Sequence, residues 1–334
     1  MSDVLALTMG DPAGIGGEIA LAAWQALRRE GPAFLAIDDP DRLGALAAFL
    51  GRDVALRPVA SAAEAVSVFS RALPVLPQPL PGPVQPGRPD PAHGPAILAS
   101  VRRAVALARS GEVAGLVTNP IAKTTLFDAG IAHAGHTTWL AELAGGGEPV
   151  MMLASPNLRV VPVTVHIPLA EVPRALTVER IVSAGRVVAA ALASDFGLAR
   201  PRLAVAGLNP HAGEGGMIGR EEERVIRPAI EMLRAIGIAA SGPYAADSLF
   251  HARAREGYEA VLAMYHDQAL IPVKTIDFAN TVNVTLGLPL VRTSPDHGTA
   301  YDIAGQGRAD PSSLIAALRL AAAMAARRRL ARAA

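Results

Sequence analysis

The sequence contains no cysteine, which excludes disulfide bonds, thiolate metal sites and a cysteine nucleophile. Its net charge is only +1, so it lacks the basic surface of a nucleic-acid-binding domain. No run approaches the roughly 20 apolar residues of a membrane span. The amino-terminal stretch also lacks the basic-then-apolar pattern of a secretory signal. These absences predict a cytoplasmic protein that binds neither nucleic acid nor a membrane.

Lysine is also scarce, because every basic residue except Lys123 and Lys274 is an arginine. A lysine ammonium is a compact charge with a tunable pKa, and arginine cannot replace it in that role. The two lysines are therefore candidate functional groups, with chance retention as the alternative. Lys123 is a further candidate near the active site.

Short apolar runs alternate with helical stretches along the 334 residues, a length that predicts two lobes. Strands are predicted at Val4–Met9, Ala33–Ile37, Val113–Thr118, Leu158–Val165, Leu203–Gly207 and Ala260–Met264. Helices are predicted at residues 18–29, 97–109, 180–193, 224–233 and 312–332. This alternation indicates an α/β fold with a mostly parallel sheet and helices on both faces. The proline-rich segment Pro74–Pro91 is predicted to be an extended surface loop and not a central strand.

Several predicted strands are followed directly by reactive side chains, namely Asp11, Lys123, His166, His211, His266 and Asp267. In open α/β sheets, ligands bind beyond the carboxyl ends of the strands. Three neutral imidazoles with one open position would form a catalytic metal site. The spacing of the histidines matches no local metal motif, so separate hydrogen-bonded histidines at strand ends remain the alternative.

Three further segments suggest ligand binding. Gly10–Gly16 follows the first strand and is either a phosphate cradle or a plain tight turn. Residues 135–138 open a helix and form either an anion site or a simple cap made by Thr137. The segment His297–Gly307 combines flexible glycines with Asp302, whose carboxylate could hold a ribose diol.

Taken together, these motifs resemble the 4-hydroxythreonine-4-phosphate dehydrogenase family over essentially the whole chain. The motifs are GDPAGIG (10–16), GHT (135–137), the His166 strand, GLNPHAGEGG (207–216), AMYHDQ (263–268), VNVTLGLPLVRTSPDHGTA (282–300) and DIAGQG (302–307). The segment DHGTAYDIAG also resembles the adenine-side loop of isocitrate and isopropylmalate dehydrogenases. The resemblance implies their two-lobed fold, with mostly parallel sheets flanked by helices and the active site in the cleft.

The resemblance also implies a division of labour between the lobes. Residues 1–125 plus 290–334 would form the cofactor-side lobe, and residues 126–289 the metal and dimerisation lobe. That fold binds NAD without a GxGxxG fingerprint, so the absence of the fingerprint is no objection. A homodimer is implied, because in the family two subunits share the active site.

Individual residues take their roles from the resemblance. His166, His211 and His266 match the ligands of one divalent metal ion per subunit, which would be Zn²⁺, Mg²⁺ or Co²⁺. The residues that match substrate contacts are His136, Thr137, Lys274, Asn283 and Arg292. The residues assigned to the cofactor are His297, Gly298, Thr299, Asp302 and Gly305. Asp302 favours NAD over NADP, because its carboxylate would repel a 2′-phosphate. Lys274, Asp247 and Asp267 are the candidate catalytic or ligand-orienting groups.

The implied reaction is the oxidation of 4-phosphooxy-L-threonine at C3, followed by decarboxylation to 3-amino-2-oxopropyl phosphate on the route to pyridoxal 5′-phosphate. Sister dehydrogenases acting on 4-phospho-D-threonate, 4-phosphoerythronate or a dihydrodiol are the nearest alternative. A non-redox acyltransferase of related fold and a non-catalytic binding protein are more distant ones. The chain departs from the family pattern at Thr138, where an acidic residue is common, and at Gly17, where proline is common. Thr138 adjoins two predicted substrate contacts and puts that detail in question.

Overall fold

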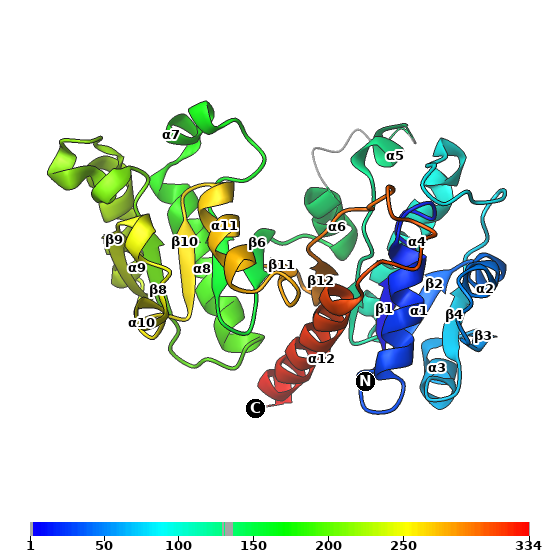
Figure 1. Cartoon of the computed structure of the whole chain (residues 1–334). Helices are drawn as coiled ribbons and strands as arrows, with labels where there is room; N and C mark the ends of the chain where they lie inside the picture. Colours follow the sequence, from blue (N-terminus) through cyan, green and yellow to red (C-terminus); the bar gives the residue numbers. More distant parts are fainter. Residues whose placement is uncertain (1–2, 129, 131–135, 334) are drawn as a thin grey trace. The chain divides into compact units, whose positions relative to one another are not determined.

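The computed structural model describes residues 3–333 apart from residue 129 and residues 131–135, with only the backbone described for Lys123, Leu126, 136–138 and 332–333. The chain divides into two compact units. The first comprises Met1–Pro149 and Leu288–Ala326, and the second comprises Val150–Gly287 and Arg327–Ala334. Strands and helices alternate along both (Figure 1).

The first unit contains a parallel sheet with the strand order β3-β4-β2-β1-β5-β12. The strands are β1 (Leu5–Thr8), β2 (Phe34–Asp38), β3 (Leu56–Pro58), β4 (Leu73–Pro77), β5 (Gly115–Val117) and β12 (Arg292–Pro295). Because all these strands run the same way, their carboxyl ends lie at one edge of the sheet. Ligands of open α/β sheets bind at that edge.

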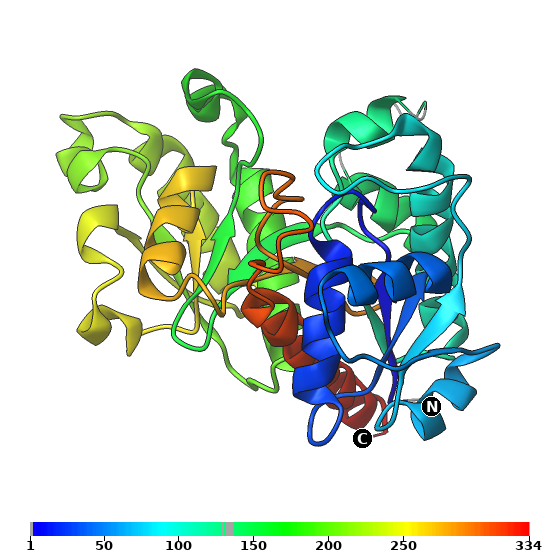
Figure 2. The ribbon, with the colours of Figure 1, turned by 45° about the vertical axis from the view of Figure 1, so that its right-hand side comes forward.

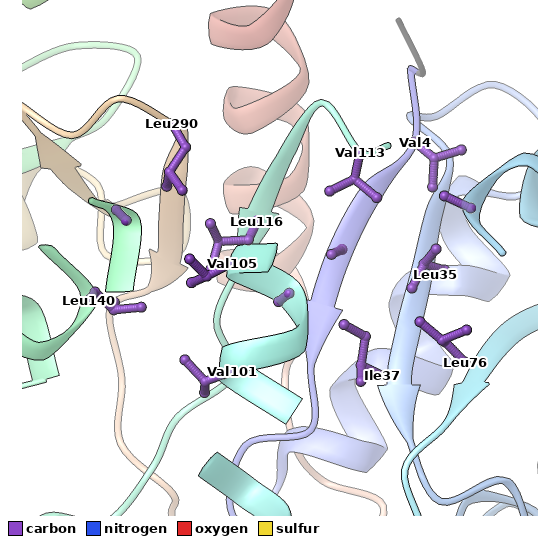
Figure 3. Packing of buried hydrophobic residues seen from close by; sticks show 14 of the residues in the cluster. Val4, Leu35, Ile37, Leu76, Val101, Val105, Val113, Leu116, Leu140 and Leu290 are labelled. Atoms are coloured by element: carbon purple, nitrogen blue, oxygen red, sulfur yellow. The ribbon is translucent and has the colours of Figure 1, made fainter. Parts of the chain in front are cut away.

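Helices cover both faces of this sheet. They are α1 (Gly16–Leu27), α2 (Pro40–Phe49), α3 (Ala62–Val68), α4 (Gly94–Ser110), α5 (Lys123–Asp128), α6 (His136–Ala144) and the part of α12 (Ser312–Ala333) up to Ala326. Helices α1 and α2 lie side by side (Figure 2). On the α4 face, Val101 and Val105 pack among Val4, which precedes β1, and the strand residues Ile37 and Leu116 (Figure 3). Burial of these side chains stabilises the unit by roughly 1.5–3 kcal/mol each.

The prediction that Pro74 begins a loop is wrong, because β4 lies between β2 and β3. Proline lacks a backbone N–H, so a strand tolerates it only where no ladder bond is needed. The bonds between β4 and β3 involve the Leu73 N–H and the Val75 carbonyl, so Pro74 is not among their donors. Pro77 is the last residue of its strand. The extended loop therefore begins after Pro77.

Residues 126–149 belong to the first unit, whereas the sequence prediction assigned them to the second. The reason is helix α6, whose Trp139, Leu140 and Ala144 are buried in the core of the first unit. Helix α6 also contacts α4. The functional labels of the two lobes remain predictions.

The second unit contains a mixed sheet with the strand order β11-β6-β7-β10-β8-β9. The strands are β6 (Val150–Ala154), β7 (Arg159–Pro162), β8 (Arg202–Ala206), β9 (Ala239–Tyr244), β10 (Ala260–Ala263) and β11 (Val282–Leu286). Strand β6 runs antiparallel to both β11 and β7, and the other pairs are parallel.

The helices of this unit are α7 (Val172–Ala175), α8 (Val178–Ser194), α9 (Arg227–Ala235), α10 (Ala252–Arg255) and α11 (His266–Ile276). Helices α8 and α9 pack together, and α11 lies against β6 and β7 (Figure 1). Ala269, Leu270 and Val273 of α11 are buried in the core of the unit. In neither unit does a helix of the described residues have the length and apolar character needed to cross a membrane.

Candidate metal and substrate site

His266 is the first residue of α11, three residues after strand β10 ends at Ala263. The turn between them is fixed by Gln268, whose Oε1 accepts a hydrogen bond from the Met264 N–H at 2.6 Å. The Nε2 of the same side chain donates to the Gly207 carbonyl at 2.8 Å. Gly207 directly follows β8, so one buried amide ties the start of α11 to the segment that leads to His211.

A second tie joins this turn to the segment that carries His166. The Thr164 hydroxyl, which is buried, donates to the Met264 carbonyl at 2.7 Å. His166 itself lies four residues beyond the end of β7 at Pro162, not directly at the strand end as predicted. The strand prediction ran too long because Val163 and Val165 are apolar, whereas the register with β10 ends at Pro162.

The rings of His166 and His266 have centroids 5.6 Å apart. Two imidazoles bound to one ion through bonds of about 2.0–2.1 Å have centroids roughly 4.5–5.5 Å apart at bond angles of about 90–120°, so the observed value is at the upper end of this range. The observed separation therefore fits two ligands of a common ion. Asp267 Oδ1 lies 2.7 Å from Nδ1 of His266, the contact by which carboxylates orient metal-binding histidines. That contact leaves Nε2 as the ring nitrogen of His266 for a metal.

His211 lies on a loop of unusual backbone conformation, Pro210–Gly216. His211, Ala212 and Glu214 all have positive φ, at 52°, 51° and 44°. Left-handed backbone costs a non-glycine residue about 1–2 kcal/mol. Strain of this kind persists only where surrounding contacts hold it, and such residues cluster at functional sites. The His211 side chain is 70% exposed.

The donor set fits a divalent metal in part. Within residues 3–333, leaving aside 129 and 131–135, no three His, Asp or Glu side chains are gathered closely enough to hold an ion. His166 and His266 are brought together, and His211 is not grouped with them. Imidazole nitrogens suit zinc and cobalt better than magnesium, which prefers oxygen. The three-histidine site remains a prediction.

The other predicted residues of the second unit lie on three different elements. Asp247 is exposed and belongs to a short segment, Ala246–Ser248, that contacts the Pro210–Gly216 loop. Lys274 lies in the last turn of α11, roughly 12 Å along the helix from His266. Its Nζ stands 5.7 Å from the ring centroid of Phe278. Asn283 is half-buried on β11.

Arg292 is the predicted substrate residue of the first unit that is described in full. It is 5% exposed, and its Nη2 donates to the Thr118 hydroxyl at 2.6 Å. Burial lowers the pKa of Arg292 to about 10, so the guanidinium stays cationic at neutral pH. His136 and Thr137 begin helix α6 and Lys123 begins α5, but the side chains of all three lie outside the described part of the chain.

The predicted cofactor segment packs against the turn after β1. The Ile15 N–H donates to the Thr299 carbonyl at 3.0 Å. A Cβ at Gly14 would lie 2.8 Å from that carbonyl oxygen, so only glycine allows this close approach. The Tyr301 hydroxyl donates to Asp11 Oδ2 at 2.7 Å. The two motifs, far apart in sequence, therefore form one structural element.

A buried carboxylate on α1 holds the other end of the cofactor segment. Glu18, 1% exposed, accepts hydrogen bonds from the N–H groups of Gly305 and Gly307, the latter at 3.1 Å. Beside these residues lies a cavity of about 490 Å³, whose lining includes Gly14, Glu18, Leu46, Phe49, Pro86 and Gly305. The cavity lies at the carboxyl ends of β1, β2 and β4, where α/β sheets bind ligands.

Four N–H groups of the turn Gly10–Gly16 are used within the protein. Those of Asp11, Gly14 and Ile15 donate to backbone carbonyls, and the Ala13 N–H donates to the Asp11 side chain. These four groups are not available to a phosphate, and the choice between a phosphate cradle and a plain turn stays a prediction. Asp11 also accepts a hydrogen bond from the Thr125 hydroxyl at 2.9 Å, which links the turn to α5.

Comparison with known proteins identifies the family. The family model of pyridoxal phosphate biosynthetic protein PdxA matches residues 32–321, most of the chain. The chain belongs to the PdxA family. It is an oxidoreductase, and pyridoxal phosphate biosynthesis is the function that its family supports. The resemblance predicted from the sequence motifs is confirmed.

Curated relatives agree over almost the full length. A 4-hydroxythreonine-4-phosphate dehydrogenase of Caulobacter vibrioides is 57% identical, with 97% of this chain and 98% of the relative covered. One of Bradyrhizobium diazoefficiens is 52% identical, with 96% and 97% covered.

Solved structures of PdxA proteins confirm the fold. The 4-hydroxythreonine-4-phosphate dehydrogenase of Klebsiella pneumoniae has a TM-score of 0.86 at 37% identity, covering 97% of this chain and 98% of that one. A terephthalate 1,2-cis-dihydrodiol dehydrogenase of Burkholderia xenovorans has a TM-score of 0.64 at 30% identity, covering 96% and 97%. The predicted α/β fold of the isocitrate dehydrogenase type is therefore confirmed.

Three structural residues of the site were not assigned a role from sequence, namely Glu18, Glu222 and Gln268. Each is a buried polar side chain that accepts backbone N–H groups. Gln268 is the last residue of the AMYHDQ motif. A polar residue in the first helical turn after a strand could have been predicted to hydrogen-bond that turn. Glu222 lies in an acidic run that is also typical of a solvated surface.

Proposed function

We propose that this chain oxidises 4-phosphooxy-L-threonine at C3. The C3–H leaves as hydride to NAD⁺, the hydroxyl proton goes to a base, and the C3 hydroxyl becomes a ketone. The resulting 2-amino-3-oxo-4-phosphooxybutanoate is a β-keto acid, so it loses carbon dioxide and gives 3-amino-2-oxopropyl phosphate. Support comes from relatives more than 50% identical that are named 4-hydroxythreonine-4-phosphate dehydrogenase.

The observation that carries the chemistry is the pair of imidazoles, His166 and His266, with ring centroids 5.6 Å apart. We assign these rings and His211 as the ligands of one divalent ion, Zn²⁺, Co²⁺ or Mg²⁺. Such an ion supplies a Lewis acid that lowers the pKa of the substrate hydroxyl. Asp267 holds the ring of His266, and Asp247 lies on a segment beside the His211 loop. We assign both carboxylates to orienting ligands or relaying protons.

Anionic groups of the substrate are assigned to the cationic and polar side chains of the family pattern. Arg292 is a buried cation whose Nη2 donates to the Thr118 hydroxyl. Its planar guanidinium offers a bidentate fork to a phosphate or carboxylate, whereas Lys274 offers a point charge. Asn283, His136 and Thr137 complete the proposed substrate contacts. Lys274 is also the candidate for proton transfer.

NAD⁺ is the proposed oxidant. Its proposed contacts are His297, Gly298, Thr299, Asp302 and Gly305. The cavity of about 490 Å³ beside Gly305 supports a bound nucleotide there, because it combines an apolar lining with backbone that Glu18 holds in place. Asp302 is exposed, as a carboxylate that meets a ribose would be before the cofactor binds.

We also propose a homodimer whose subunits share the active site. Large apolar side chains stand exposed around the predicted metal ligands of the second unit, including Leu169 at 67% and Met217 at 80%. Val165 and Ile167 flank His166 and are partly exposed as well. Exposed apolar clusters commonly mark protein–protein contacts. Molecular mass in solution, measured by light scattering, tests this point.

We place the enzyme in the cytoplasm, where NAD⁺ is shared with other dehydrogenases.

The experiment is NADH formation by purified, metal-loaded protein, measured with 4-phosphooxy-L-threonine, 4-phospho-D-threonate and terephthalate cis-dihydrodiol, each with and without chelator. The dihydrodiol is included because a cis-dihydrodiol dehydrogenase shares 30% identity over nearly the whole chain. We expect turnover of the threonine phosphate that the chelator abolishes. Turnover confined to either other substrate would overturn the proposed substrate but leave the redox chemistry.

A further inference from the structure

The loop that carries His211 is anchored by one buried side chain, Glu222, which is 2% exposed. Its Oε1 accepts hydrogen bonds from the backbone N–H groups of Leu208 at 2.8 Å and Asn209 at 2.7 Å. Its Oε2 accepts one from the Asn209 Nδ2 at 2.9 Å. A single carboxylate therefore fixes the two residues that precede Pro210 and His211.

Glu222 also meets the far side of the same loop. A Cβ added at Gly213 would lie 2.7 Å from Oε2 of Glu222, closer than real Cβ contacts allow. A Cβ added at Gly207 would lie 2.9 Å from the Cα of Ala212 and 3.2 Å from Oε1 of Glu222. The carboxylate thus fills the inside of the turn, and the loop wraps around it without spare room.

Glu222 is held in place by the helix to which it belongs. Glu222 begins a single π-helical turn, Glu222–Ile226, which continues directly into α9. Turns of this type inside helices are frequent at functional sites. Ile226, Ile230 and Leu233 are all buried beneath it. The position of Glu222 is therefore set by core packing and not by the loop that it holds.

We propose that Glu222 is a positioning residue that holds His211 in its left-handed conformation for binding of the divalent metal ion. This inference rests on the metal site of the proposed function. Glu222 is not itself a ligand in this account, because both of its oxygens already accept hydrogen bonds from the loop. Glu222 acts by fixing the backbone of the loop, and its negative charge serves only to accept these hydrogen bonds.

The first test is Glu222→Gln, which preserves size and helix packing but turns one carboxylate oxygen into a donor. In the Oε1 position the new amide NH2 group would face the backbone N–H groups of Leu208 and Asn209, and in the Oε2 position it would face the Asn209 Nδ2. Two donors cannot bond to each other. An amide flip of Asn209 does not repair the fault, since its Nδ2 also donates to Glu221 at 2.7 Å. The matched control is Glu223→Gln, the same substitution at the exposed neighbouring position.

The measurements are the Kd for Zn²⁺ by competition titration and the visible absorption spectrum of the Co²⁺-loaded protein, both well below the melting temperature. We expect Glu222→Gln to weaken metal binding about 10- to 100-fold, the range for groups that orient metal ligands, and to alter the Co²⁺ bands. Glu223→Gln should stay within about twofold of the parent. Loss of stability alone would leave the Co²⁺ bands unchanged.

A second pair of variants tests the same contact from the loop side. Gly213→Ala and Gly215→Ala each place a Cβ on a glycine of positive φ, at 81° and 64°. Only the first meets Glu222, because a Cβ at Gly215 has no atom within 4 Å. We expect Gly213→Ala to weaken metal binding and Gly215→Ala to do so much less. This pair keeps the proposal testable if Glu222→Gln does not fold.

Three results would overturn the inference. One is an unchanged Kd and Co²⁺ spectrum in Glu222→Gln, and another is equal weakening by both glycine variants. The third is complete loss of metal binding in Glu222→Gln with an intact fold, which would make Glu222 a ligand. If the parent protein binds no divalent ion, the proposed metal function itself fails, and the two failures are thereby distinguished.

Discussion

Glu18 in the first unit and Glu222 in the second are both buried carboxylates that accept backbone N–H groups from a segment with a proposed ligand-binding role. The segments differ in backbone conformation. Glu18 holds Gly305 and Gly307, whose positive φ values glycine adopts without steric strain. Glu222 holds a loop in which His211 itself has a positive φ. The same anchoring chemistry thus supports a relaxed segment in one unit and a strained one in the other.

The difference follows from what each segment contributes. The predicted cofactor segment offers mainly close backbone approach, so glycine serves at its turns, with Ala300 as a non-glycine exception at φ 45°. In the proposed function the Pro210–Gly216 loop presents an imidazole to the metal ion, so glycine cannot replace His211. A strained position is then retained, and the buried anchor offsets its cost. Removing the anchor should therefore affect the two units differently.

The largest expected effect is at the histidines of the second unit. His266→Ala should lower kcat/KM by about 10³-fold or more, since loss of a Lewis acid removes several kcal/mol of transition-state stabilisation. NADH formation and bound metal are measured together. His251→Ala is the control, an exposed histidine that caps α10. If kcat/KM falls less than tenfold in His266→Ala, a metal ion bound by His266 does not take part in the reaction.

The next largest effect is expected for Glu18, the buried carboxylate of the first unit. Glu18→Gln should raise the KM for NAD⁺ about 10- to 100-fold, because hydrogen bonds to a charged group contribute about 1.5–3 kcal/mol. The Kd for Zn²⁺ should not change, since Glu18 belongs to the other unit. Glu30→Gln, just beyond the same helix, is the control. An unchanged KM for NAD⁺ would mean that Gly305 and its neighbours do not contribute to cofactor binding.

A smaller effect concerns the contact between Tyr301 and Asp11. Burial raises the pKa of Tyr301 to about 12, and the hydrogen bond to Asp11 with its negative charge acts in the same direction. Asp11→Asn should lower that pKa, measured from phenolate absorption, with Tyr301→Phe identifying the signal. No downward shift would mean that Asp11 does not act on this phenol.

The sign of the pH dependence follows from the raised pKa of Tyr301. Stability contributed by the protonated phenol is present in full below its unfolded pKa, near 10, and is lost as the pH rises through about 12. The difference in unfolding free energy between the parent protein and Tyr301→Phe should therefore narrow from pH 10 to pH 12. Urea unfolding at these pH values measures it.

Much of the fold was predictable from local pattern. Apolar runs located β1, β2, β5, β8 and β10 to within a few residues, because buried parallel strands are continuously apolar. Strand β4 was missed, since its prolines argue against a strand unless the neighbouring register is known. The lobe boundary was misplaced because burial of Trp139 depends on contacts with α4, far away in sequence.

The candidate site was predictable only in part, and for a physical reason. Histidines after strand ends are visible in sequence, since their position follows from the sheet. The anchors are not, because Glu18 and Glu222 act on backbone groups 287 and 14 residues away, respectively. Nothing in the local sequence separates such a carboxylate from a solvated one. Only the fold shows which acid is buried and which N–H groups it meets.

The most direct test of the account is a titration of metal-free protein with Co²⁺, in which the visible bands of the bound ion and NADH formation from 4-phosphooxy-L-threonine are followed together. If the bound ion is the Lewis acid of the reaction, both signals rise in parallel and saturate at one ion per subunit. Full activity before any Co²⁺ is added, or saturation of the bands without activity, would contradict it.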